Sequence, residues 1–343
     1  MCTSLDDQPG KNGPEVSALG FGAMGLYGAN ENERLIGRVL ATRRSEVFLC
    51  TEFGVILGPN GVPAGISGSA DYVRQSCEAS LKRLNTDYIE LYYVHRIDPN
   101  TPIEETVGAM AELVKEGKIH HLGLSESSVS TLRRAHAVHP IAAIQVEYSP
   151  WEVSIEDNGL LAACCELGVA IVAYSPLGAG FLTGKFRSAD ELDPNDRRRA
   201  SPRFQGENFA KNVEIALQFK KLSEAKGVSA SQLVLGRALG WGNICLFFNH
   251  LEDNLAANQI SHSDEDDGAI RDLIKQISVA GTRYAEAGMK PTSLDPDPTK
   301  LGANRVGSGS NGVGSNELGV PALLDPTKMG LWVRDRQMDS RGL

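Results

Sequence analysis

Five side chains that can move protons or hold polar ligands follow separate apolar runs of the sequence. Each stands at or just past the carboxyl end of its run; they are Glu52, His95, Ser125, Gln145 and Tyr174. A histidine and a carboxylate can exchange protons with a substrate, and hydroxyl and amide groups can orient one. If the apolar runs are parallel strands, these side chains meet at one end of a single sheet. The spacing therefore predicts a polar site suited to acid–base chemistry.

The apolar runs alternate with amphipathic stretches of helical length. Runs without strict polar–apolar alternation are typical of parallel strands that are covered on both faces. The expected strands cover residues 16–24, 47–53, 88–94, 119–125, 143–147, 170–174 and 244–248. The expected helices cover residues 70–84, 102–115, 127–137, 156–167, 208–225 and 229–239. Strand–helix repeats of this kind predict a parallel sheet with right-handed crossovers.

Two architectures are compatible with these repeats. Gly20, Gly22 and Gly25 match the G-x-G-x-x-G pattern of a doubly wound dinucleotide-binding fold. However, no helix of the expected kind follows at once, and no acidic residue ends a second strand about 20 residues later. A (β/α)₈ barrel fits better, because polar residues at its strand ends line one mouth of the barrel. We therefore expect an α/β chain with TIM-barrel architecture.

Length, composition and charge exclude several classes of protein. The 343 residues are 41% hydrophobic and 22% charged, which is a globular balance. No apolar run reaches the roughly 18–20 residues that cross a bilayer, and the first residues lack the features of a secretory signal. The net charge of −9 disfavours a nucleic-acid partner. We expect a cytoplasmic protein that contacts neither membrane nor nucleic acid.

The six cysteines indicate neither a metal site nor a disulfide framework. None of them forms a C-x-x-C pair, and the seven histidines do not stand at zinc-ligand spacing from them. We expect small, buried, free thiols, as in a reducing compartment, and no bound metal.

The composition changes near residue 290. From there the chain is rich in Gly, Ser, Asn and Pro and shows no periodicity of a helix or strand. We expect residues 1–290 to form the barrel and residues 291–343 to form a low-complexity, disordered tail. The last apolar piece, MGLWVRDRQMD, is a candidate for local docking without a catalytic role.

Longer sequence blocks, in a fixed order over roughly residues 16–290, resemble the aldo-keto reductase family. They are LGFGAMGL, YGANENERLIGRVL, VFLCTEFG, SLKRLNTDYIELYYVHRIDP, PIEETVGAMAELVKEGKIHHLGLSE, AIQVEYSPW, GVAIVAYSPLGAGFLTGK and HLEDNLAAN. The resemblance is strongest to the microbial and fungal branch that includes pyridoxal reductases and relatives of potassium-channel β subunits. It implies a TIM barrel, bound NADP(H), and reduction of an aldehyde or ketone.

The resemblance also implies four catalytic residues, an Asp, a Tyr, a Lys and a His. Tyr27, in YGANENERLIGRVL, matches the tyrosine that donates a proton to the carbonyl oxygen. His95, in YYVHRIDP, matches the histidine that orients that oxygen. The lysine, held by the Asp, favours the phenolate that donation leaves behind. Hydride comes from the nicotinamide, so the protein supplies positioning and electrostatics.

Two of the four catalytic positions differ from the family. The lysine belongs in a Thr-Lys-Phe-Gly run, and this chain has Glu52 at that place. The Asp belongs about five residues before the tyrosine, where this chain has Gly22. A piece of about 25–30 residues, the size of a βα unit, is absent before Tyr27. We therefore expect a barrel that lacks the first helix and second strand, is shrunken or open at a seam, and has impaired activity.

The residues expected around the nicotinamide match the family pattern better than the residues expected around the phosphates. By resemblance, Tyr174 stacks on the nicotinamide, and the further cofactor positions are Ser125, Gln145, Ser175, Leu177, Gly180, Asp253 and Asn254. His250 stands where the family has an arginine for the 2′-phosphate, and the Pro-Gly-Thr run before it is missing. We expect NADP as the cofactor, bound weakly, with NAD as a possible substitute.

The function that the resemblance implies is NADP(H)-dependent reduction of a small or medium carbonyl compound, with fungal specialised metabolism as the expected setting. Two alternatives stay open. One is a non-catalytic protein that binds the cofactor and regulates a partner, and the other is a non-functional truncated product. The sequence predicts neither the substrate nor the oligomeric state.

Overall fold

The computed structural model describes residues 14, 16–17, 19–23, 31–58, 63–239, 244–248, 257, 264–276, 279–283 and 330–333. Eight strands form a closed barrel in the order β1–β10–β2–β5–β6–β7–β8–β9. They are β1 (Leu19–Gly22), β2 (Val47–Phe53), β5 (Ile89–Val94), β6 (Ile119–Ser125), β7 (Ile141–Glu147), β8 (Ala170–Tyr174), β9 (Ile244–Phe248) and β10 (Gly330–Val333). This confirms the predicted α/β barrel.

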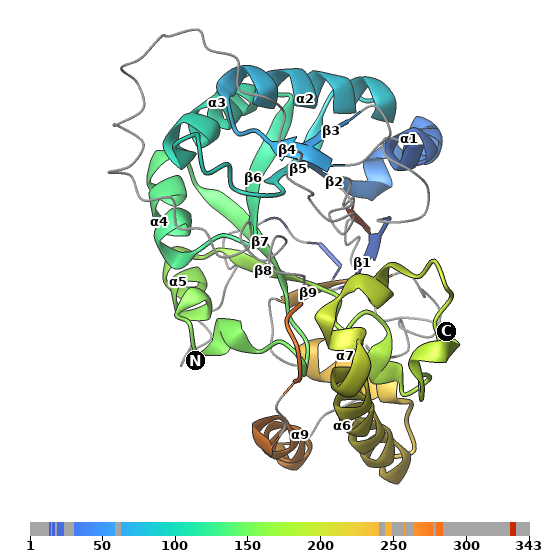
Figure 1. Cartoon of the computed structure of the whole chain (residues 1–343). Helices are drawn as coiled ribbons and strands as arrows, with labels where there is room; N and C mark the ends of the chain where they lie inside the picture. The colour runs from blue at the N-terminus through green and yellow to red at the C-terminus, as the bar shows by residue number, and fades with distance from the viewer. Residues whose placement is uncertain are drawn as a thin grey trace, which may run out of the picture.

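Helices surround the barrel (Figure 1). They are α1 (Glu31–Arg43), α2 (Ala70–Leu84), α3 (Ile103–Lys115), α4 (Val129–Val138), α5 (Leu160–Leu167), α6 (Gly206–Ala225), α7 (Ala230–Leu239) and α9 (Asp264–Gln276). Strands β2, β5, β6, β7, β8, β9 and β1 are paired in parallel wherever they are neighbours. Their carboxyl ends therefore meet at one mouth of the barrel, as the polar residues at the strand ends predict.

Helix α2 shows how local sequence fixes these elements. The Ser69 hydroxyl accepts a hydrogen bond from the Tyr72 amide and caps the first turn, and Asn85 ends the helix with a φ of 52°. Between these caps Val73, Cys77 and Leu81 are buried on one stripe. The helix has the bounds that the periodicity predicts.

Side chains on the strands alternate between the barrel interior and the helix layer. Phe48, Cys50, Leu91 and Tyr93 pack together with Ala143 and Val172 as one buried cluster. Leu49, Phe53 and Tyr92, at the intervening positions, pack into the cluster shared with the helices. Glu52 and His95 are two residues after Cys50 and Tyr93. Because side chains alternate along a strand with a period of two, Glu52 and His95 lie on the interior side as well, at the mouth of the barrel.

The sheet is closed by a strand from the expected tail. Strand β10, the short dark-red strand beside β1 in Figure 1, lies between β1 and β2 and is antiparallel to both. Gly330 pairs with Gly22 on one side and with Cys50 on the other. The expectation of a shrunken or open barrel is therefore wrong. Residues 330–333 belong to the apolar piece that was a candidate for local docking, and they form this strand. The other residues after 290 lie outside the described ranges.

Three further observations extend or correct the sequence-based picture. A small antiparallel hairpin, β3 (Val55–Leu57) and β4 (Pro63–Ile66), follows β2 and was not predicted. Cys50, Cys77 and Cys164 are free and buried, but Cys165 is disulfide-bonded, so the expectation of free thiols is wrong for that residue. Among the described residues, no helix combines the length and apolarity needed to cross a membrane.

Removal of β10 should open the barrel. We expect a chain that ends at residue 329 to lose about 2–5 kcal/mol of unfolding free energy, because the facing edges of β1 and β2 lose their hydrogen-bond partners. Urea denaturation measures the loss, and hydrogen exchange at β1 and β2 amides locates it. A chain that ends at residue 337, which keeps β10, is the control. Equal stability of the two shortened chains would contradict this role of β10.

Candidate active site

Three of the predicted site residues meet at the mouth of the barrel. Glu52 Oε2 lies 3.5 Å from His95 Nδ1, and both side chains are 1% exposed. The other oxygen of Glu52, Oε1, accepts a hydrogen bond of 2.6 Å from Gln145 Nε2. These residues come from the ends of β2, β5 and β7. A carboxylate, an imidazole and an amide are thus held together in a dry environment, where charge interactions are strong.

Arg96 joins this group to β6. Its Nη1 atom donates to the carbonyl oxygen of His95 at 2.8 Å and to Ser125 Oγ at 3.4 Å. Arg96 is 1% exposed and Ser125 is fully buried. The backbone amide of His95 donates to the carbonyl oxygen of Phe53 at 2.8 Å. The position of His95 is therefore fixed through its backbone as well as through Glu52.

Tyr174 is held in place by a carboxylate that follows β6. Its hydroxyl donates to Glu126 Oε1 at 2.7 Å, and the ring is 8% exposed. The same oxygen accepts from the Glu147 amide and from Arg283 Nη1, each at 2.9 Å. Glu126 has a φ of 53°, an unfavourable value for a non-glycine residue. The contacts that converge on its carboxylate hold this strained backbone.

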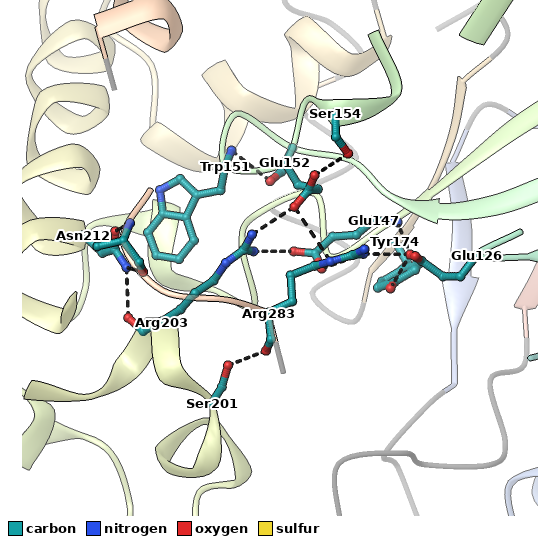
Figure 2. Close-up of polar contacts among 12 residues, drawn as sticks. Glu126, Glu147, Trp151, Glu152, Ser154, Tyr174, Ser201, Arg203, Asn212 and Arg283 are labelled. Atoms are coloured by element: carbon teal, nitrogen blue, oxygen red, sulfur yellow. Dashed lines mark hydrogen bonds and ion pairs between the residues drawn. The ribbon is translucent and has the colours of Figure 1, made fainter. Parts of the chain in front are cut away.

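A second arginine completes a buried charge cluster, shown in Figure 2. Arg203 donates from Nη1 to Glu147 Oε1 at 3.0 Å and from Nη2 to Glu152 Oε2 at 2.9 Å. Arg283 also lies 3.5 Å from Glu147 Oε2. In Figure 2 the two guanidinium groups enter from one side and point toward the three glutamates. We call Glu126, Glu147, Glu152, Arg203 and Arg283 the charge cluster.

The two carboxylates nearest Tyr174 respond to the cluster in opposite directions. Burial by itself raises the pKa of Glu126, but Arg283 and Arg96 outweigh it and hold that pKa below its ordinary value. For Glu147 burial dominates, and Arg203 and Arg283 do not fully offset the rise in its pKa. Burial disfavours the charge on Arg283, yet Glu126, Tyr174 and Glu147 raise its pKa. Glu126, which accepts the hydrogen bond from the Tyr174 hydroxyl, is thus better stabilised as an anion than Glu147.

The loop after β8 contains four residues with positive φ values. Ser175 and Ala179 have φ values of 51° and 54°, and Gly178 and Gly180 have values of 56° and 84°. A Cβ atom at Gly178 would lie 3.0 Å from the Trp151 ring, so the loop packs there against Trp151. Arg198 Nη1 donates to the carbonyl oxygen of Ala179 at 2.8 Å. A guanidinium group thus lies against the turn that contains Ser175, Leu177 and Gly180.

The structure unites some predicted site residues and leaves others untested. Glu52 contacts both His95 and Gln145, and Arg96 links His95 to Ser125. The Tyr174 hydroxyl donates to Glu126 of the charge cluster. Tyr27, Asp253 and Asn254 lie outside the described residues. Glu126 and Glu147 were not predicted as site residues, although both stand at or after strand ends, where the same signal identified their neighbours.

Comparisons with known proteins agree on one family. The profile described as "Aldo/keto reductase family" matches residues 23–275. The aldo-keto reductase str7 of Strobilurus tenacellus is 46% identical over 273 residues, which cover 77% of this chain and 79% of the relative. The aldo-keto reductase yakc [NADP(+)] of Schizosaccharomyces pombe is 41% identical over 269 residues, with coverage of 76% and 79%.

A solved structure gives the same picture for the fold. The glycerol dehydrogenase of Gluconobacter oxydans superposes with a TM-score of 0.64 at 26% identity. The superposition covers 75% of this chain and 81% of the dehydrogenase chain. The likeness extends over most of both chains, so it concerns the barrel as a whole.

Loss of one cation from the charge cluster should be costly. We expect Arg283→Met to lower the unfolding free energy by about 3–5 kcal/mol, because Glu126 and Glu147 remain buried without that partner. Arg133→Met is the control, since Arg133 pairs with Glu166 at the surface and should cost at most about 1 kcal/mol. Urea denaturation at pH 7 measures both. Similar small losses would show that the cluster does not stabilise the fold.

The lowered pKa of Glu126 predicts a pH-dependent contribution to stability. Glu126 is ionised in both states above its ordinary pKa of 4.5, and its full contribution is present there. That contribution disappears as the pH falls below 4.5 toward the lower pKa of the folded state. We therefore expect the stability gap between wild type and Glu126→Gln to shrink with acidification. Urea denaturation from pH 7 to pH 3.5 tests this, and a constant gap would contradict it.

Proposed function

Because the chain belongs to the aldo/keto reductase family, we propose that it reduces an aldehyde or ketone to an alcohol with a nicotinamide dinucleotide. The observation that carries the proposal is the convergence of His95, Gln145 and Tyr174 with Ser125 at one mouth of the barrel. These are the positions that the family resemblance assigns to the carbonyl and the nicotinamide. NADP is the favoured cofactor, as in the relative whose name contains NADP(+).

The residues present fit a nicotinamide group. Tyr174 offers an aromatic ring whose orientation is fixed by the bond from its hydroxyl to Glu126. Gln145 uses its Nε2 atom on Glu52, and its Oε1 atom is the acceptor suited to a carboxamide N–H. The amides of Gly178 and Gly180 donate within the turn at residues 175–180, so the other backbone amides of this turn would hold the pyrophosphate. When bound, the reduced nicotinamide supplies hydride.

The chain's own residues then bind and orient the substrate. His95, fixed by Glu52 and by the backbone of Phe53, would hold the carbonyl oxygen of a small substrate. The burial of this group excludes water from the reacting centre and strengthens its electrostatics. Glu52 at the lysine position cannot favour a tyrosine anion as a cation would. We therefore propose slower turnover than in relatives that carry the lysine.

A second candidate function is cofactor binding without turnover. It is favoured by Glu52, which adds a negative charge where the family uses a positive one and is engaged with both His95 and Gln145. Such a protein would keep the Tyr174 ring for stacking on the nicotinamide and the turn at residues 175–180 for the pyrophosphate. Specialised metabolism remains an expectation from the resemblance, and a cytoplasmic location remains an expectation from the composition of the sequence.

A titration with NADPH, followed by turnover of a generic aldehyde, separates these candidates. We expect binding with slow turnover. Tyr174→Ala should weaken binding about tenfold through loss of ring stacking, whereas Tyr174→Phe, which keeps the ring, should weaken it less. Tyr88→Ala is the control, because Tyr88 stacks on His120 away from the site. Binding without turnover would favour the second candidate, and absence of binding would contradict both.

A further inference from the structure

A carboxylate faces a histidine inside the barrel mouth, and the family resemblance gives this contact no role. Glu52 Oε2 and His95 Nδ1 are 3.5 Å apart, and neither side chain is more than 1% exposed. Reductases of this kind are expected to have a lysine at the position of Glu52, which would repel a protonated histidine. An anion in place of this cation stabilises the protonated imidazole ring, whereas the cation would destabilise it.

We propose that Glu52 and His95 form a proton-donating pair, in which the carboxylate stabilises the imidazolium and His95 Nε2 gives its proton to the substrate carbonyl oxygen. The proposal rests on the carbonyl reductase function proposed above. His95 is the catalytic residue of the pair, because it touches the reacting oxygen. Glu52 is a positioning residue that acts through His95.

Glu52 is placed to carry the negative charge that the pair needs. Gln145 Nε2 donates to Glu52 Oε1 at 2.6 Å, and a donated hydrogen bond favours the ionised form of a carboxylate. With Oε1 engaged by the amide, Oε2 is the oxygen that faces the imidazole. A contact on Nδ1 orients the ring and assigns the second nitrogen, Nε2, to the substrate.

The other charged groups that the structure describes around His95 are Arg96, Glu126 and Arg283. Arg96, which follows β5, opposes a second positive charge, but its guanidinium interacts with the Glu126 carboxylate from the end of β6. Glu126 is in turn paired with Arg283. Tyr174, on β8, is tied to Glu126 by its hydroxyl. Among the described residues, Glu52 is therefore the anion in direct ion-pair contact with the imidazole of His95.

The chemical step balances without a further reactant. Reduction adds hydride from the reduced dinucleotide to the carbonyl carbon, and the electron pair of the C=O π bond moves to oxygen. The oxygen takes the proton from His95 Nε2, so an O–H bond forms as an N–H bond breaks. His95 is left as neutral imidazole and regains a proton from water after the alcohol leaves.

The pair can be tested first without cofactor or turnover. In protein labelled with ¹³C at the histidine rings, NMR follows the titration of each of the seven histidines, and His95→Gln identifies the signal of His95. We expect Glu52→Gln, which keeps the shape and the bond with Gln145, to move the His95 midpoint to lower pH. Glu52→Asp should keep it near the wild-type value. Glu105→Gln, at an exposed position of α3, controls for the loss of one charge.

The pH dependence of kcat then tests whether the proton that titrates on His95 is the one donated to the substrate. The pair predicts that kcat for aldehyde reduction falls as the pH rises through the His95 midpoint, and that Glu52→Gln shifts this fall to lower pH. At pH 7 we expect the variant to lose about 10- to 100-fold in kcat, with little change in NADPH affinity. Glu52→Asp should restore part of the rate.

Four results would overturn the assignment. An unchanged His95 midpoint in folded Glu52→Gln would show that the carboxylate does not act on the ring. A kcat–pH profile that does not follow His95, or a complete loss of turnover in Tyr27→Phe with the His95 titration intact, would place the proton elsewhere. NADPH binding without turnover at any pH would show that the pair donates nothing.

Failure of the proposed function has a different signature. If NADPH does not bind at all, the reductase function fails, and the donor role of His95 fails with it. The NMR titration still reports in that case whether Glu52 acts on the ring. A shifted midpoint without NADPH binding would identify the contact as structural and would refute proton donation.

Discussion

The site depends on closure of the sheet around the barrel. Parallel strands bring their carboxyl ends to one mouth only while each is paired on both sides, because an unpaired edge splays and exposes backbone groups to water. Between β1 and β2 this pairing comes from β10, a strand from near the end of the chain that runs in the opposite direction. Glu52 is at the end of β2, so its contacts with His95 and Gln145 rely on that closure.

The mouth of the barrel is held together mainly by charge. Glu126, Glu147 and Glu152 meet Arg203 and Arg283, so each buried ion has a partner of opposite sign. Buried pairs add little net stability compared with an apolar core, but they are costly to break and they fix geometry. Here they fix the Tyr174 hydroxyl and the strained backbone at Glu126. The glutamates of the charge cluster pair with its arginines, whereas the Glu52 carboxylate contacts His95.

Local patterns in the sequence predicted seven of the eight barrel strands, several of the helices and the convergence of several site residues. Helix α2 follows from its caps and its buried stripe, and Glu52, His95 and Gln145 meet because parallel strands end at one mouth. Residues 330–333 lie in the apolar piece that was a candidate for docking, but the strand itself could not be predicted, since four residues show no periodicity and gain their structure from the two strands beside them. The arginines of the charge cluster come from segments 56 and 157 residues away from the glutamates they bind, beyond the reach of local patterns.

The proposed function requires that Tyr174, Gln145 and the Glu52–His95 contact share one nicotinamide pocket. A crystal structure of the protein with NADPH tests it most directly. We predict the nicotinamide ring against Tyr174, its carboxamide beside Ser125 and Gln145, and the Glu52–His95 contact retained next to it. A nicotinamide bound elsewhere on the chain, or a mouth in which His95 and Tyr174 face separate cavities, would contradict the account.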